Sequence, residues 1–126
     1  MMVRGIRGAT TVDRDDAEAI LEATEELLRE IIARNDLQPE FVASALFTAT
    51  PDLTAQFPAA AARRLGWTLV PLLNFTEIGV AGGLARCVRV LVHVNTQRSQ
   101  EEVVHVYLRE AQSLRPDLLT RPRTVP

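Results

Sequence analysis

One segment of the chain alternates so strictly that it fixes much of the fold. Between residues 86 and 96 every second side chain is a valine: Val88, Val90, Val92 and Val94. The side chains between them are of mixed polarity: Cys87, Arg89, Leu91, His93 and Asn95. Neighbouring side chains of a β-strand point to opposite faces of a sheet, so this is a strand with one fully apolar face. The other face needs a different cover, which in a small chain is often a second subunit.

A long amphipathic helix is predicted over residues 16–35. Apolar side chains recur there with the i, i+3, i+4 and i+7 spacing of a one-sided helix. Acidic residues fill its first turns and arginines its end, which suits the helix dipole. Glu25 and Glu30 each stand four residues before an arginine, in the favourable order. We interpret this helix as scaffold, with one face buried and the other solvated.

The remaining segments predict further strands and shorter helical pieces. Strands are expected at residues 2–10, 42–50 and 67–75, with a short helix at 57–65, helical turns near 39, 100 and 114, and a short strand near 105–108. Gly5 and Gly8 in the first strand indicate a bulge or a close approach by another chain or a ligand. Pro71 makes the third strand an edge strand or one with a bulge.

This order of elements predicts an α+β fold with α/β-like alternation. It is a mixed β-sheet with one long and one short helix on one face. The length of 126 residues favours one domain, placed at residues 1–116. Residues 117–126 carry two prolines and are expected to form a mobile tail.

Composition excludes several classes of function. All 14 basic residues are arginine, so a lysine Schiff base or a P-loop lysine is impossible. A net charge of −2 argues against a general nucleic-acid or membrane-surface binder. One cysteine and two histidines are too few for a disulfide or an ordinary metal site, so we expect no metal. Residues 1–10 carry Arg4 and Arg7 and no apolar run, so we expect no signal peptide. No apolar run is long enough to span a membrane, and the expected compartment is the cytoplasm.

Arg7, Arg89 and Glu77 are the strongest candidates for chemistry. The two arginines stand in mid-strand, and either lie on an exposed sheet face or hold a guanidinium over a concave site; the apolar neighbours of Arg89 favour the second. Glu77 is either a surface carboxylate or an acceptor for a substrate hydroxyl, or a general base. Arg63 and Arg115 are ordinary helix-end and tail charges when taken alone. Residue chemistry therefore predicts an oligomeric domain that recognises an anion through arginine.

The chain resembles the trimeric α/β-type chorismate mutases along almost its whole length. The resemblance lies in residues 2–12 (MVRGIRGATTV), 49–53 (ATPDL), 57–59 (FPA), 66–67 (GW), 82–84 (GGL), 87–90 (CVRV), 105–108 (HVYL) and 114–118 (LRPDL). It implies a homotrimer whose sheets form a pseudo α/β barrel, with active sites between adjacent subunits. The implied reaction is the pericyclic, Claisen-type rearrangement of chorismate to prephenate in phenylalanine and tyrosine biosynthesis, with no cofactor.

The resemblance also implies a role for each site residue. Arg89 would face the ether oxygen of the breaking bond, Arg7 and Tyr107 a substrate carboxylate, and Glu77 the ring hydroxyl. The other substrate-binding residues would be Leu73, Asn74, Phe75 and Thr76 beside Glu77, Phe57 from the other subunit, Leu114, and Arg63 and Arg115 at the entrance.

Two positions depart from the family pattern. Asn74 replaces a cysteine that family members can carry, and its amide can still donate a hydrogen bond. Ala60 replaces a lysine found near the entrance in some relatives, which weakens steering of the substrate but not the chemistry. Two other functions stay open: an imine-hydrolysing enzyme on a similar trimeric scaffold, and a non-catalytic trimeric module that binds a metabolite through arginine.

Overall fold

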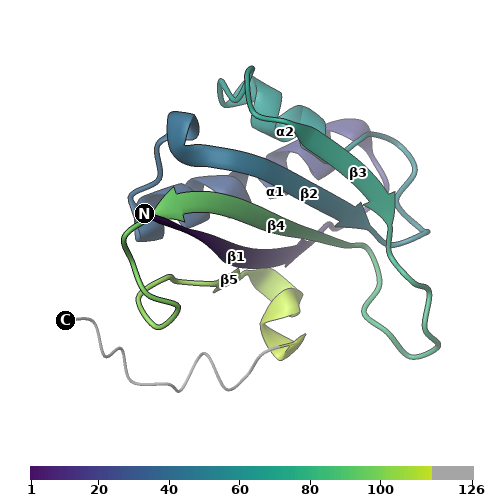
Figure 1. Ribbon diagram of the computed structural model, residues 1–126. Coiled ribbons are helices and arrows are strands. Elements are labelled where there is room, and N and C mark those ends of the chain that lie inside the picture. The colour runs from purple at the N-terminus through teal and green to yellow at the C-terminus, as the bar shows by residue number, and fades with distance from the viewer. Residues whose placement is uncertain (115–126) are drawn as a thin grey trace.

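The computed structural model describes residues 1–114, which form a mixed five-stranded sheet backed by helices on one side (Figure 1). The strands are β1 (Met2–Thr11), β2 (Val42–Ala49), β3 (Leu72–Thr76), β4 (Cys87–Thr96) and β5 (Val106–Tyr107). The helices are α1 (Ala17–Asn35) and α2 (Ala59–Arg64), with 3-10 turns η1 (Pro39–Phe41) and η2 (Arg109–Leu114). The predicted α+β class is confirmed. The predicted mobile tail, residues 117–126, and Arg115 lie outside the described residues.

The sheet has the order β3–β2–β4–β1–β5, so the alternating strand β4 lies at its centre. β4 runs antiparallel to β1 and β2, whereas β3 is parallel to β2 and β5 is parallel to β1. The four valines of β4 are at most 3% exposed, because they pack on the helices. A Cβ added at Gly8 would lie 2.7 Å from Cδ1 of Ile31, so this glycine lets α1 of the same chain approach the sheet closely, where the sequence had indicated another chain or a ligand.

Helix α1 begins and ends at polar groups that satisfy its free backbone ends. Asp16 Oδ2 accepts a hydrogen bond from the Ala19 N–H at 3.0 Å, and Asp36 ends the helix in a left-handed conformation. The predicted pairs Glu25–Arg29 and Glu30–Arg34 are present, at 3.6 and 3.1 Å. At the helix end the buried Asn35 side chain exchanges hydrogen bonds with the Val104 backbone, which ties the segment before β5 to α1.

The third strand begins later than the sequence predicted. It was expected over 67–75, but β3 starts at Leu72, after Pro71. Pro71 has no N–H to donate, and only its carbonyl accepts from the Ala45 N–H at 3.0 Å. Trp67 is 2% exposed and fills the core beneath α2 instead of entering the sheet. The edge position of β3 is confirmed.

Candidate active site

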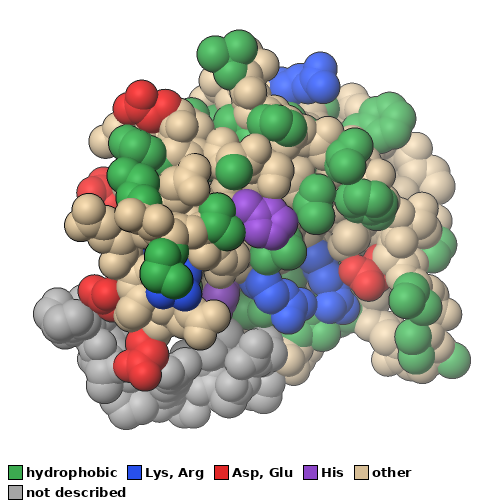
Figure 2. Space-filling model, viewed as in Figure 1, with side chains coloured by type: hydrophobic (Ala, Val, Ile, Leu, Met, Phe, Trp, Pro, Cys, Tyr) green, Lys and Arg blue, Asp and Glu red, His purple; other side chains and the backbone are tan. Residues whose placement is uncertain are grey.

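The sheet face away from the helices carries most of the predicted site residues, and we call it the open face. Residues paired across strands share a face. The register therefore places one row of side chains across all five strands: Phe75, Thr48, Arg89, Ala9 and Tyr107. The next row contains Leu73, Leu46, Leu91 and Arg7. On this face, apolar side chains surround arginine, acidic and histidine side chains (Figure 2).

Glu77 and Arg89 meet on the open face, although twelve positions separate them in the chain. The Glu77 N–H donates to the Ala49 carbonyl at 2.9 Å, which extends the pairing of β2 and β3 by one residue. Glu77 Oε1 accepts from the Thr48 hydroxyl at 2.8 Å and lies 3.4 Å from Arg89 Nε. The two side chains are 26% and 30% exposed, so water only partly screens the pair.

Two polar atoms on this face are buried without a hydrogen-bond partner among residues 1–114: Arg89 Nε and Tyr107 Oη. Arg89 Nε faces the Glu77 carboxylate without forming a hydrogen bond. Leaving a buried donor unsatisfied costs about 1–3 kcal/mol, so native proteins rarely do so without a reason. Both atoms belong to the same cross-strand row and are therefore placed to bind a ligand or a second chain.

Cys87 forms part of the apolar wall next to Arg89. It is buried with Ala9, Tyr107 and Ala111, and Leu114 packs against this cluster from the end of η2. Burial raises the pKa of the Cys87 thiol, and the nearby Arg89 guanidinium only opposes that shift. The thiol is therefore a neutral packing group and not a nucleophile.

A second group of predicted site residues lines a cavity beside β3. The cavity has a volume of about 550 Å³, and its walls include Phe57, Asn74, Phe75 and Thr76. Asn74 Oδ1 accepts from the Ala59 N–H at the start of α2, at 3.0 Å. The oxygen of this amide is thus already used, and its NH₂ group is the part left to face the cavity.

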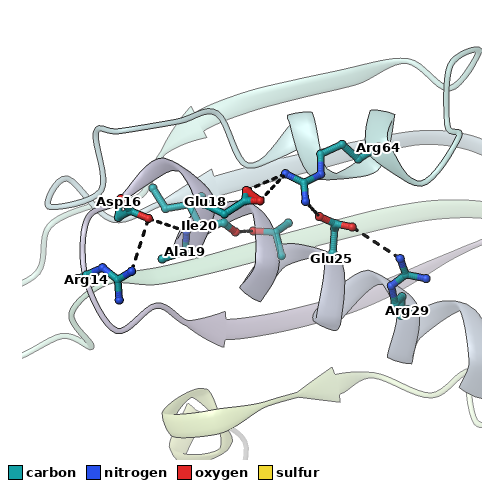
Figure 3. A network of polar contacts seen from close by, with 9 residues as sticks. Arg14, Asp16, Glu18, Ala19, Ile20, Glu25, Arg29 and Arg64 are labelled. Atoms are coloured by element: carbon teal, nitrogen blue, oxygen red, sulfur yellow. Dashed lines mark hydrogen bonds and ion pairs between the residues drawn. The ribbon is translucent and has the colours of Figure 1, made fainter.

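Arg64, one of the two arginines at the end of α2, is held by acidic side chains of α1 (Figure 3). Arg64 lies 2.8 Å from Glu18 and 2.6 Å from Glu25, both on α1, and its hydrogen bond to Glu18 raises its pKa. Arg63 is exposed and takes part in none of the ion pairs among the described residues. Arg64 therefore anchors α2 to α1, and Arg63 is the arginine available to a ligand, a distinction that the sequence did not make.

The predicted residues form two groups, and only Phe75 belongs to both, because it lies in the row of Arg89 and in the cavity wall. Along β3, Leu73 and Phe75 face outward, whereas Asn74 points back to α2. We call Arg7, Glu77, Arg89 and Tyr107 the arginine half-site, and Phe57, Arg63, Asn74 and Thr76 the pocket half-site. The first lies on the open face and the second on the α2 side of the edge strand.

Sequence reasoning missed two neighbours of the arginine half-site. Thr48 donates to Glu77, and His105 Nδ1 accepts the Arg7 backbone N–H at 3.0 Å. The sequence indicated the position of Thr48 only weakly: its two-residue spacing from Leu46 and Ser44 places these three side chains on one face of a predicted strand. Its position opposite Arg89 depends on strand register, which one sequence does not specify.

The described residues contain no cluster of three or more histidine, cysteine, aspartate or glutamate side chains that could hold a metal ion. None of the helices in residues 1–114 is long and apolar enough to cross a membrane.

Taken together, fold and site define a protein that binds a small anion over arginines on one face of a mixed sheet. Comparison with known proteins makes that class specific. The family model Chorismate mutase type I matches residues 3–118. The chain belongs to the chorismate mutase type I family.

Individual relatives agree with the family model. The chain is 52% identical to chorismate mutase AroH of Bacillus subtilis over 119 residues, which cover 94% of each chain. It is 54% identical to chorismate mutase AroH of Thermus thermophilus over 118 residues, covering 93% of this chain and 97% of the relative. The solved chorismate mutase from Clostridium thermocellum superposes with a TM-score of 0.86 at 44% identity, over 87% of this chain and 98% of that one.

These matches show that the protein is a chorismate mutase, an isomerase of aromatic amino-acid biosynthesis. They give no support to an imine-hydrolysing enzyme or to a non-catalytic metabolite-binding module.

Proposed function

We propose that the protein is a homotrimer that converts chorismate to prephenate in three clefts between subunits. Each cleft combines the arginine half-site of one subunit with the pocket half-site of the next. The observation that carries this proposal is that the side chains of Asn74 and Arg89 extend from opposite faces of the sheet in one chain. Contacts between unlike surfaces close into a ring when the rotation fits, which a trimer achieves.

Exposed apolar side chains support the assembly. Leu73 and Phe75 on the open face are 56% and 49% exposed, and Phe57 of the pocket half-site is 67% exposed. Ile78 and Val80, in the loop after Glu77, are 81% and 67% exposed. Apolar side chains gathered in this way mark interaction surfaces. A second subunit over the open face would also dry the surroundings of Arg89 and strengthen its electrostatic effect.

The arginine half-site suits a rearrangement whose transition state is polar. The reaction needs the substrate folded into a reactive conformer and the negative charge on the ether oxygen stabilised. We assign the ether oxygen to Arg89, a carboxylate to Arg7 and Tyr107, and the ring hydroxyl to Glu77. An acceleration of ~10⁶-fold requires ~8 kcal/mol. A preorganised donor such as Arg89 supplies about 3–4 kcal/mol of that.

The pocket half-site serves capture and orientation in this proposal. Phe57, Leu73, Phe75 and Thr76 line the cleft, and the Asn74 NH₂ donates to the substrate. Arg63 lies at the entrance of the cleft with Arg115 and Leu114 of the neighbouring subunit, and the arginines attract the chorismate dianion. Arg115 lies outside the described residues, so its part rests on the family resemblance alone.

The chemistry moves no proton or electron between molecules, so the proposal includes no metal or cofactor. It places the enzyme in the cytoplasm, in keeping with its biosynthetic role.

Chorismate turnover and assembly state test the proposal together. Purified protein, treated with a metal chelator and dialysed, should convert chorismate to prephenate, followed by the loss of chorismate's ultraviolet absorbance. Sedimentation equilibrium should give three times the chain mass. Activity that returns only after a metal or cofactor is added, or a fully active monomer, would refute it.

A further inference from the structure

The loop after β2 binds the segment that enters β4, and the proposed chemistry leaves this contact unexplained. The contact involves Thr50 and Asp52, from the ATPDL segment in the sequence, and residues 86–87. We propose that Thr50 and Asp52 are positioning residues, which hold Arg89 and Glu77 in their reactive arrangement. The inference rests on the catalytic role proposed above for Arg89.

Four hydrogen bonds make up the contact. The Thr50 N–H donates to the Cys87 carbonyl at 3.0 Å, and the Thr50 hydroxyl accepts from the Cys87 N–H at 2.9 Å. The same hydroxyl donates to Asp52 Oδ1 at 2.5 Å. Asp52 Oδ2 accepts from the Arg86 N–H at 2.9 Å. Thr50 is 9% exposed, so these bonds compete little with water.

The backbone held by this contact is unusual. Arg86 has a φ of 45°, in the left-handed region that side chains other than glycine rarely adopt. Its N–H is bound by Asp52, its carbonyl accepts from the Val12 N–H at 2.8 Å, and its Nε donates to the Val12 carbonyl at 2.9 Å. A conformation of this kind persists only where the surroundings over-determine it, and such conformations cluster at functional sites.

The contact is joined to both members of the arginine–glutamate pair. Arg89 follows Cys87 by two residues, so its side chain leaves the same face of β4. Glu77 is bound through its N–H to the Ala49 carbonyl, one residue before Thr50. Residues 49–52 therefore bind both the end of β3, which leads to Glu77, and the start of β4, which leads to Arg89. In this way they hold the two side chains at their 3.4 Å contact.

The Asp52 carboxylate is ionised in this arrangement. The hydrogen bond from the Thr50 hydroxyl is the main cause that lowers the pKa of Asp52, and the Arg86 N–H adds to it. The acceptor oxygens are therefore available at every pH at which the enzyme would work.

The test compares three variants with a matched control. Thr50→Val removes the hydroxyl at constant shape, Thr50→Ser keeps it, and Asp52→Ala removes the carboxylate. Glu102→Ala is the control, because Glu102 also accepts a backbone N–H within a turn, from Ser99 at 2.8 Å, but beyond the opposite end of β4. Chorismate turnover gives kcat and KM, and circular dichroism at the assay temperature checks that each variant is folded.

Thr50→Val and Asp52→Ala should lower kcat roughly ten- to hundred-fold with little change in KM, because a small misplacement of a catalytic group costs rate. Thr50→Ser should recover most of the loss, and Glu102→Ala should stay within about two-fold of the parent. If folded Thr50→Val and Asp52→Ala keep the parental kcat, or if Thr50→Ser is as poor as Thr50→Val, the positioning role is wrong.

A second arm separates positioning from general stability. In an Arg89→Gln background, Asp52→Ala should cause a much smaller further loss of kcat than in the parent, because the part of its effect that passes through Arg89 is already lost. Losses that multiply would overturn the proposal. If Arg89→Gln alone keeps the parental kcat, the catalytic role of Arg89 fails; if Arg89→Gln is impaired and folded Asp52→Ala is not, only the positioning role fails.

Discussion

The two faces of the central strand β4 are built for different purposes. On the covered face, Val88, Val90, Val92 and Val94 are buried against helices, as folding alone requires. On the open face the same strand carries Cys87, Arg89, Leu91 and His93, beside apolar groups that water still reaches. Arg89 Nε is buried there without a hydrogen bond from the described residues.

The difference shows which residues folding explains and which it does not. An apolar face on a helix layer stabilises the chain at about 25 cal/mol per Å² of apolar surface removed from water. A half-buried arginine beside a glutamate gains little by comparison and is a weak argument for stability. In the proposed mechanism the open face serves binding and catalysis, so substitutions on the two faces should change different measurable quantities.

The largest expected effect lies on the covered face. Phe47, in β2, is fully buried opposite Val90. Phe47→Ala should lower the free energy of unfolding by about 3–5 kcal/mol, because it leaves a cavity in the core. Phe75→Ala, on the open face, should instead make assembly depend more strongly on protein concentration. Urea unfolding measures the loss of stability, and sedimentation measures the change in assembly. Equal losses of unfolding free energy in the two variants would contradict the proposed difference between the faces.

Arg89→Gln should show the reverse pattern. We expect kcat to fall about 10²–10³-fold, as when a preorganised donor to a developing charge is lost. The midpoint of urea unfolding should hardly change, because the guanidinium contributes little to folding. Arg63→Ala should act mainly on KM, increasingly so at low salt, since it serves capture. An Arg89 variant with unchanged kcat would contradict the mechanism.

Asn74 tests the link between β3 and α2. Asn74→Ala leaves the Ala59 N–H without its acceptor and should cost about 1 kcal/mol of stability. Asn74→Asp retains an acceptor oxygen and should recover the stability but not the substrate affinity, because it lacks the NH₂ group. Thermal unfolding and KM measure the two effects separately. Recovery of both by Asn74→Asp would remove the NH₂ group from the proposed site.

The smallest effect concerns the acid limit of stability. Hydrogen bonds from the Thr54 hydroxyl and from the N–H groups of Thr54 and Ala55 lower the pKa of Asp15 in the folded protein. A group with a lowered folded pKa stabilises the fold above its unfolded pKa, ~3.9, and this contribution is lost as the pH falls through the folded value. Asp15→Asn should therefore flatten the acid limb of a stability curve. Asp13→Asn is the control, because Asp13 is exposed and its side chain forms no hydrogen bond or ion pair with residues 1–114. Equal changes in both variants would contradict the assignment.

Much of the fold could be predicted from periodicity. The valine alternation of β4 and the apolar spacing of α1 gave their positions to within one or two residues. The third strand was placed too early, because Trp67 and Val70 look like strand residues but are buried in the core next to α2. At these positions tertiary packing outweighed the strand propensity of the side chains.

The site was less accessible to sequence reasoning. Arg7, Arg89 and Glu77 stood out because they lie in or just after a strand, where the i,i+4 ion pairs of a helix surface cannot account for a charged side chain. The roles of Thr48, Thr50 and Asp52 depend on strand register and on a left-handed residue at 86, which no local pattern specifies. Asn74 was expected to donate through its amide, and that stays a prediction; the sequence did not indicate that its oxygen accepts from the Ala59 N–H.

The central claim is that each active site combines two chains, and mixed trimers test it most directly. Arg89→Gln impairs the arginine half-site, and the double variant Phe57→Ala, Arg63→Ala impairs the pocket half-site. When the two proteins are refolded together in equal amounts, about a quarter of the interfaces should pair two intact halves. The account predicts that the mixture is far more active than the sum of its parents at low chorismate concentration. Activity no greater than that sum, in mixtures shown to contain hybrid trimers, would contradict it.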